Sequence, residues 1–308
     1  MITDPLKIFI SVVELKNFSR AAEELYISQP SVSLQIRNLE NELGTKLINR
    51  SPKHLELTQS GEIFYGYAKN ILLLYDKAKE EIDLLSNVVT GGLKVGASNT
   101  IGEYILPFVL TEFAAQFPKV GIETLIANTE EISHAVRANH LDLALVEGEV
   151  SHSDLIIRPL MEDEIILVVP NQHALARLPI VTADHLQDQV WILRESGSGT
   201  RAFSDKLIKD RGIQVKKSYI LGSGQAVKQA VIAGLGIALV SNWIVRKELK
   251  ARELTAIRIK GKRLTRYFSL ITSKNHEQSK AVEVFTEQLF THELLTSASE
   301  SARKGIDV

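Results

Sequence analysis

The chain of 308 residues contains no cysteine. This absence excludes disulfide bonds, zinc sites built from thiolates and catalysis by a thiol nucleophile. It is compatible with a reducing compartment, and we expect a cytoplasmic location. Hydrophobic residues make up 44% and charged residues 24% of the chain, which is the composition of an ordinary globular protein with enough apolar material for real cores.

Long hydrophobic runs are also missing. The longest apolar stretches, such as residues 165–170 and 235–240, are far shorter than the roughly 20 residues that a membrane-spanning helix needs. The first residues carry no basic segment, and their apolar pattern is soon interrupted by Glu14 and Lys16. We therefore expect neither a secretory signal peptide nor a membrane as partner.

The chain has no excess of positive charge. Its 36 lysines and arginines face 37 acidic residues, for a formal net charge of −1, and the first ninety residues are not basic either. Many DNA-binding proteins are strongly basic, so a DNA-binding function here must depend on a local arrangement of side chains. At this length, more than one domain is expected.

The beginning of the chain shows such an arrangement. Apolar residues recur at helical spacing from Pro5, with Asp4 as the expected N-cap, and a second short helix follows Ser19, its expected cap. Ser28 suits the N-cap of a third helix, because Pro30 then falls in the first turn, where its missing N–H costs nothing. This pattern predicts a helix-turn-helix, whose third helix would enter the major groove of double-stranded DNA.

The third helix would carry a polar face, and the segment after it would form a wing. Residues 46–58 are typical of two short strands around a basic turn, whose side chains, with Lys46 as a further candidate, would contact the DNA backbone. The acidic residues of this region can face away from DNA. The candidate DNA contacts on the face and the wing are Ser28, Gln29, Pro30, Ser31, Ser33, Gln35, Arg37, Arg50, Lys53 and His54.

A small helical bundle with a solvated polar face would show the same helix spacing. The residue strings separate the two interpretations: FSRAA (residues 18–22), SQPSVS (28–33), IRNLE (36–40), LG (43–44), LINR (47–50) and LTQSGE (57–62). This ordered set closely resembles the N-terminal signature of LysR-type transcriptional regulators. Leu34 departs from that signature, because many members carry arginine or another polar residue there, and the departure removes one expected phosphate contact.

A long helix is expected from Thr58, its N-cap, to about Leu85. Its apolar residues follow a heptad pattern, which favours a coiled pairing of helices, while a stripe packed on the core of the same chain is the alternative. The resemblance implies a linker helix that pairs protomers into a homodimer or homotetramer, and residues 88–92 would form a hinge. The heptad residues are Phe64, Tyr67, Ile71, Leu74, Ala78, Ile82 and Leu85.

From residue 93 onward, strands and helices alternate, which predicts an open, largely parallel α/β sheet. One helix is expected over residues 101–116. The remaining chain is long for a single sheet of this kind, so two subdomains fit better. The resemblance implies a fold similar to periplasmic solute-binding proteins, with crossovers near residues 161–163 and 266–268.

The expected fold class is therefore α+β overall, with an N-terminal winged helix-turn-helix, a long linker helix and a C-terminal α/β effector domain of two subdomains. The expected division is residues 1–58 for the DNA-binding domain, 59–90 for the linker helix and hinge, and 91–308 for the effector-binding domain. Within the last, subdomain I would take about 91–161 plus 268–308, and subdomain II about 162–267.

Ligands of open α/β sheets bind beyond the carboxyl ends of the strands. Two strands here end in small, hydroxyl-bearing residues that run into a helix, and such helix N-termini form a ready anion site. An ordinary capped turn is the alternative for residues 196–199. Arg201 could add a bidentate contact to the anion. Residues 222–225 are a weaker candidate for a third side of the binding site. The candidate effector-binding residues are Ser98, Asn99, Thr100, Glu147, Ser196, Gly197, Ser198 and Thr200.

Glu147 has two interpretations: it could orient a ligand group, or it could act at the hinge between subdomains. No catalytic residue, metal site or cofactor is expected, because P-loop, metalloprotease and nucleophile-elbow motifs are missing and the histidines are scattered. We therefore do not expect an enzyme. Two alternatives stay open, a solute receptor and an enzyme that would use the loop 196–201.

The strings GASNTIG (residues 96–102) and ESGSGTR (195–201) resemble those of LysR-type regulators of Rubisco operons and of sulphite and cysteine metabolism. This resemblance implies a ligand-responsive regulator, often an activator, that senses a small anion such as sulphite, sulphate or a phosphorylated metabolite. Effector binding would close or twist the effector domain and so reposition paired DNA-reading heads. RNA polymerase is a further implied partner.

Overall fold

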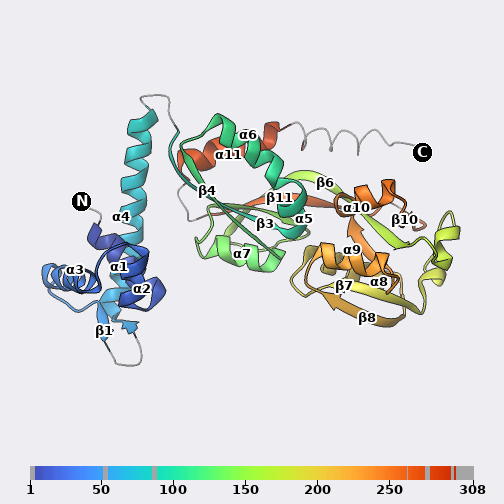
Figure 1. Ribbon diagram of the computed structural model, residues 1–308, viewed down its shortest axis with the longest axis horizontal. Coiled ribbons are helices and arrows are strands. Elements are labelled where there is room, and N and C mark those ends of the chain that lie inside the picture. Colours follow the sequence, from blue (N-terminus) through green and yellow to red (C-terminus); the bar gives the residue numbers. More distant parts are fainter. Residues whose placement is uncertain are drawn as a thin grey trace. The chain divides into compact units, whose positions relative to one another are not determined.

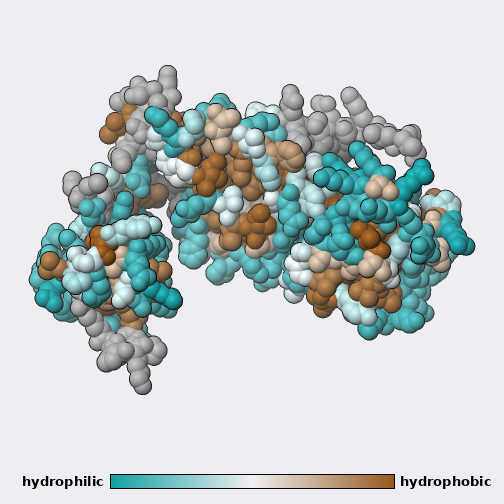
Figure 2. All heavy atoms as spheres, viewed as in Figure 1, coloured by the Kyte–Doolittle hydropathy of each residue, from teal (hydrophilic) through white to brown (hydrophobic). Residues whose placement is uncertain are grey.

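The computed structural model describes residues 4–50, 55–84, 89–261, 263–274, 278–292 and 295. The chain forms two compact units, Met1–Asn87 and Val88–Val308 (Figure 1). Most of the surface visible in Figure 2 is hydrophilic, with apolar patches between the polar side chains. The finer division at residues 58, 90, 161 and 267 stays a prediction.

Short helices and a small hairpin build the head of the first unit. Phe9, Val12, Ala21, Val32 and Ile36 are fully buried at its centre, and they come from all of the short helices, so the core fixes how these helices pack. The elements are α1 (Asp4–Leu15), α2 (Phe18–Glu24), α3 (Gln29–Glu42), β1 (Ile48–Arg50) and β2 (Leu55–Leu57), with β1 and β2 antiparallel.

The helix caps agree with the sequence at one position and differ at another. Ser28 is confirmed as the N-cap of α3, where its side chain accepts a hydrogen bond from the backbone N–H of Ser31. The prediction that Ser19 caps α2 is wrong. Asn17 is the cap, because its side-chain oxygen accepts from the backbone N–H groups of both Ser19 and Arg20.

The long helix α4 (Gln59–Leu84) follows the hairpin. Thr58 accepts a hydrogen bond from the backbone N–H of Gly61, as expected of its N-cap. Of the heptad residues, Phe64 packs on the head, with its ring 5.4 Å from that of Phe9. Leu85 lies outside the described residues. The remaining heptad residues are exposed on this chain: Tyr67, Ile71, Leu74, Ala78 and Ile82.

The second unit is built on a mixed sheet, so the expectation of a largely parallel sheet is wrong. Only β3 runs parallel to its neighbours β4 and β5, whereas the other pairs of this sheet are antiparallel. The seven strands are β3 (Gly91–Ser98), β4 (Val120–Ala127), β5 (Leu143–Glu147), β6 (Leu155–Pro170), β9 (Ala238–Ser241), β10 (Leu254–Ile257) and β11 (Thr265–Ser273).

The antiparallel pairing arises because the chain passes between two lobes along β6 and β11. These long strands pair with each other, and their register places Asp163 opposite Arg266. Lobe I is built around β3, β4 and β5, and lobe II around β9, β10 and the separate parallel pair β7 (Gln189–Arg194) and β8 (Val215–Leu221). The crossovers expected near residues 161–163 and 266–268 fall within these two strands.

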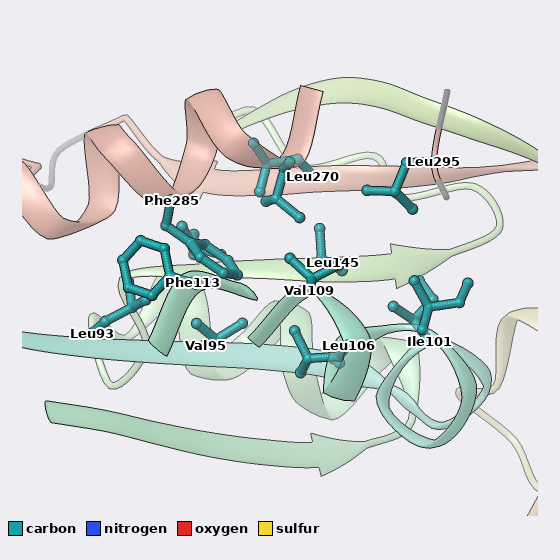
Figure 3. Close-up of a cluster of buried hydrophobic side chains, with 14 of the residues drawn as sticks. Leu93, Val95, Ile101, Leu106, Val109, Phe113, Leu145, Leu270, Phe285 and Leu295 are labelled. Atoms are coloured by element: carbon teal, nitrogen blue, oxygen red, sulfur yellow. The ribbon is translucent and has the colours of Figure 1, made fainter. Parts of the chain in front are cut away.

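Alternate residues of the strands face different helices. Leu143 and Leu145 of β5 belong to the core under α6 (Leu106–Gln116) and α11 (Lys280–Thr291), whereas Ala144 and Val146 pack with residues of α7 (Thr129–Arg137) on the other face. Figure 3 shows the first of these cores, in which labelled side chains from strands and helices point toward one another.

The helix expected over residues 101–116 is two helices, α5 (Asn99–Tyr104) and α6. The break falls at Ile105, whose φ of −125° leaves the helical region. Pro107 lies in the first turn of α6, and it has no N–H to continue the hydrogen bonds of α5. The remaining described helices belong to lobe II. They are the α-helices α8 (Gly199–Asp210), α9 (Gly224–Ile232) and α10 (Asn242–Lys250) and the short 3-10 helices η1 (Ala174–Arg177) and η2 (Asp184–Leu186).

Candidate functional site

The outward face of α3 carries most candidate DNA contacts. Ser28 Oγ and Ser31 Oγ lie 2.8 Å apart, and Gln29 Nε2 donates to Ser33 Oγ at 2.9 Å. These bonds hold the polar side chains of the N-terminal half of the helix in defined positions. Ser28, Gln29, Pro30, Ser31 and Arg37 are exposed, while Ser33 and Gln35 are half-buried.

A buried glutamate fixes the wing to α3. Glu40 is only 3% exposed, and its Oε1 accepts hydrogen bonds from the backbone N–H groups of Leu47, at 3.0 Å, and Ile48, at 3.3 Å. Its Oε2 accepts from Lys46 Nζ at 2.8 Å. Burial alone would raise the pKa of Glu40, but the hydrogen bonds from these three residues bring it below its ordinary value.

The predicted wing contacts are described only in part. Arg50 ends β1, and its side chain lies outside the described part of the chain, as do Lys53 and His54. Lys46, named from the sequence as a further contact to the DNA backbone, pairs with Glu40 while 69% of its side chain stays exposed.

In the second unit, hydroxyl groups gather where the parallel strands of lobe I end. Ser98 ends β3 and Thr100 lies in the first turn of α5, and their side chains are 0% and 1% exposed. Neither hydroxyl has a hydrogen-bond partner among the described residues. Asn99 Nδ2 instead donates to the carbonyl of Ala127, at the end of β4.

The loop after β7 lies against the same strand ends. The carbonyl of Gly197, a residue with φ +83°, accepts a hydrogen bond from the backbone N–H of Glu130 at 3.1 Å. Gly199 lies so close to β5 that a Cβ there would come within 2.1 Å of the Glu147 carbonyl oxygen. Ser198 between them is 2% exposed, and its hydroxyl too has no partner in the described chain. The loop that carries Ser198 therefore lies against the end of β5, the strand next to β3, which ends in Ser98.

Glu147 and Thr200 belong to a buried network around Arg266. The Arg266 guanidinium donates to Glu147 Oε2 at 2.9 Å, to Thr200 Oγ1 at 3.0 Å and to Asp163 Oδ2 at 2.9 Å. Asp163 also accepts from Ser241 Oγ at 2.6 Å. Burial raises the pKa of Asp163 more than Arg266 and Ser241 lower it. The network joins β5, β6, β11 and α8, which favours the hinge interpretation of Glu147.

Arg194, at the end of β7, is a further candidate site residue that no sequence motif indicates. Its Nε and Nη2 each donate to the Glu195 carboxylate at 2.7 Å, but its buried Nη1 has no partner among the residues described. Arg201, expected to add a bidentate contact, instead donates to Asp205 and to the Arg194 carbonyl, each at 2.9 Å. The only signal for Arg194 was a lone arginine that ends an apolar strand.

Cations of lobe II act on α5. Burial raises the pKa of Glu103, while the cations Arg194 and Lys228 of lobe II act against this rise. The Tyr104 hydroxyl donates a hydrogen bond to Gln225 Oε1 at 3.2 Å. The segment 222–225, the candidate for a third side of the site, therefore contacts α5. Two cations therefore act on the helix that bears Thr100, and each is paired with a carboxylate, Arg194 with Glu195 and Lys228 with Glu248.

Three further observations concern Ser196, metal binding and membrane insertion. Ser196 is exposed, in contrast to Ser198. Within the described ranges, no group of three or more histidines, aspartates and glutamates is placed to hold a metal ion. None of the helices described is both long and apolar enough to cross a membrane.

Comparison with known proteins yields two family matches that together cover most of the chain. The family described as "Bacterial regulatory helix-turn-helix protein, lysR family" matches residues 3–62, and "LysR substrate binding domain" matches residues 86–293. The HTH-type transcriptional regulator CysL of Bacillus subtilis (strain 168) is 45% identical over 289 residues, which are 94% of this chain and 97% of that protein.

Two further similarities concern a relative and a solved structure. A probable RuBisCO transcriptional regulator of Phaeodactylum tricornutum is 36% identical over 290 residues, covering 92% of this chain and 94% of that protein. The regulatory domain of CcmR from Synechocystis PCC6803, solved in complex with 2-PG, superposes with a TM-score of 0.62 at 27% identity. The superposition covers 66% of this chain and 97% of that domain.

Proposed function

The chain belongs to the LysR family of transcriptional regulators and is a ligand-responsive, DNA-binding regulator, and from this premise we propose that it senses a small oxyanion or a phosphorylated metabolite. The proposed site lies where β3 and β7 end, and it uses the hydroxyls of Ser98, Thr100 and Ser198. Arg194 supplies positive charge. Glu147 and Thr200 act through the hinge network instead of touching the effector.

One observation carries this proposal: at the ends of β3 and β7, three buried hydroxyls have no hydrogen-bond partner among the described residues. A buried polar group that lacks a hydrogen bond costs about 1–3 kcal/mol, so a ligand that accepts from these hydroxyls would recover that cost. The N-terminus of α8 adds backbone N–H groups and a positive dipole end. Together with Arg194, these groups favour a ligand that is rich in acceptors and negatively charged.

The relatives narrow the choice of anion. CcmR was solved with 2-PG, which makes 2-PG a first probe for this chain. The resemblance to regulators of sulphite and cysteine metabolism adds sulphite and sulphate. We expect one of these anions, or phosphate, to raise the melting temperature of the full-length protein in a thermal-shift titration, because binding to the folded state alone stabilises it.

Variants of the hydroxyl residues test the assignment. Thr100→Ala and Ser198→Ala are each expected to weaken binding of that anion about tenfold, because each removes one hydrogen bond to a charged group. Ser218→Ala, on the exposed part of β8, is the matched control and should leave the affinity unchanged. Isothermal titration measures all three. Equal affinity in the two site variants and the wild type would contradict the proposed site.

DNA binding should depend on α3 and the wing. Gln29→Ala and Arg50→Ala are expected to weaken operator binding by about tenfold each, since each removes a polar contact to a base edge or a phosphate. Effector affinity should not change. The control is Lys7→Ala, which removes an exposed cation from α1. Electrophoretic mobility shift on the region upstream of the chain's own gene measures the effect, and no loss in either variant would argue against these contacts.

We propose that α4 pairs two protomers, because five heptad residues are exposed on the isolated chain. Ile71→Lys with Leu74→Glu should convert the assembly to a smaller species in light scattering coupled to size-exclusion chromatography. An unchanged mass would contradict the role of this face. A further association of dimers into a homotetramer is part of the same proposal, with paired half-sites as the DNA target.

The relatives are named as regulators, and we propose that this chain has no enzymatic activity. Turnover of the bound anion that Ser196→Ala abolishes would contradict this. We also propose that the protein acts in the cytoplasm, where a regulator meets chromosomal DNA and RNA polymerase. A solute receptor would not bind DNA, so the mobility shift separates that alternative.

A further inference from the structure

The apolar side chain of Leu34 occupies the middle of the outward face of α3. It is 54% exposed, although leucine is most often buried. The buried residues Val32, Ile36 and Leu39 fix the rotation of the helix. At 100° per residue, position 34 falls almost opposite to the centre of these three. Leu34 therefore projects away from the core of the head.

The neighbours of Leu34 on this face are a proline and two polar residues. Pro30 precedes it by four positions, and Arg37 and Asn38 follow by three and four, so all share its side of the helix. All three are exposed. Towards the N-terminus, the Ser28–Ser31 and Gln29–Ser33 hydrogen bonds hold polar groups in place. An apolar group thus lies at the centre of a face whose margins suit bases and phosphates.

The chemistry of the major groove decides what such a group can bind. Phosphates and the polar edges of guanine, adenine and cytosine require hydrogen-bonding partners, which leucine cannot supply. Thymine alone carries a methyl group in that groove, and apolar side chains contact it. We propose that Leu34 contacts the 5-methyl group of one thymine in each half-site and so sets a requirement for thymine at that position. This inference rests on the proposed role of α3 as the reading helix.

Selection of binding sites from a random DNA library identifies the base-pair position that Leu34 contacts. Full-length wild type is expected to select thymine at one position in each half-site, and Leu34→Ala should lose that preference while it keeps the others. In the selected site, deoxyuridine then replaces this thymine, which deletes the methyl group and keeps the base pair. Loss of one buried methyl should weaken wild-type binding about fourfold, and should leave binding by Leu34→Ala unchanged.

Two further variants sharpen the test. Leu43→Ala removes a leucine that is 42% exposed at the C-cap of the same helix, on the side of the buried stripe. This variant should select the same site as the wild type. Leu34→Gln should prefer adenine instead of thymine at this position, because an amide forms two hydrogen bonds with adenine. A stable head in these variants is verified by circular dichroism.

The outcomes separate the inference from the proposed function. If the wild type selects a defined site but deoxyuridine costs nothing at every thymine, the assignment of Leu34 is wrong and α3 remains the reader. The same holds if Leu34→Ala selects the wild-type site without change. If the wild type selects no sequence at all, the proposed reading role of α3 is itself wrong, and the inference fails with it.

Discussion

Replacing Arg266 with alanine is expected to lower the free energy of unfolding of the second unit by about 3–5 kcal/mol. Arg266 is 7% exposed and donates to Glu147, Asp163 and Thr200. Its removal would leave two carboxylates buried at 1% and 0% exposure without their cation. Uncompensated buried charge is among the largest penalties that a single substitution can introduce.

Tryptophan fluorescence reports this change selectively. The chain has two tryptophans, Trp191 and Trp243, and both belong to the second unit. A urea titration followed by their emission therefore measures the unfolding of that unit. The matched control is Arg263→Ala, which removes an ion pair to Glu164 whose side chains are 54% and 32% exposed. Solvent screens such a pair, so its loss should cost less than about 1 kcal/mol.

Replacing the network with uncharged side chains separates the cost of unpaired buried charge from the cost of lost packing. Arg266→Met combined with Glu147→Gln and Asp163→Asn should recover most of the stability lost in Arg266→Ala, because no unpaired charge remains buried. Equal stability of Arg266→Ala and Arg263→Ala would contradict the role of the network. The network ties β5 of lobe I to the crossover strands β6 and β11, so we also expect Arg266→Ala to weaken the transmission of effector binding to DNA affinity.

Local patterns in the sequence predicted the head and the strand ends well. The Ser28 cap and the position of Pro30 follow from backbone chemistry within a few residues, and the structure has both. Ser98, Thr100 and Ser198 are predicted site residues because small hydroxyl residues follow apolar strands, and all three are buried. In these places, the local sequence and the tertiary structure favour the same conformation.

Features that depend on distant residues could not be predicted. Arg266 lies 103 positions from Asp163 and 119 from Glu147, and no periodicity connects them. The direction of β6 and β11 relative to their neighbours is likewise a property of the chain's path and not of strand propensity, so the sheet was expected to be more parallel than it is. In the sequence, Arg194 is an ordinary charged residue at the end of a strand. Only the folded structure shows that its buried Nη1 has no partner within the described part of the chain.

The second large effect is expected at Glu40. Glu40→Ala should destabilise the head by about 2–4 kcal/mol, because the buried backbone N–H groups of Leu47 and Ile48 lose their acceptor and Lys46 loses its partner. Glu40→Gln keeps an acceptor for the two N–H groups and loses only the ion pair, so its cost should be clearly smaller. Glu42→Ala, an exposed position in the same last turn of α3, is the control.

Hydrogen exchange locates this effect. The amides of Leu47 and Ile48 should exchange at least about tenfold faster in Glu40→Ala than in the wild type, since β1 is no longer fixed to α3. The pKa of Glu40 is lowered in the folded state, so its contribution to stability is complete above the ordinary value of 4.5 and is lost as the pH falls through the folded-state value. Glu40→Ala should remove this acid-sensitive part of the stability. Unchanged exchange at both amides in Glu40→Ala would show that other contacts position the wing, and DNA affinity should then be unaffected too.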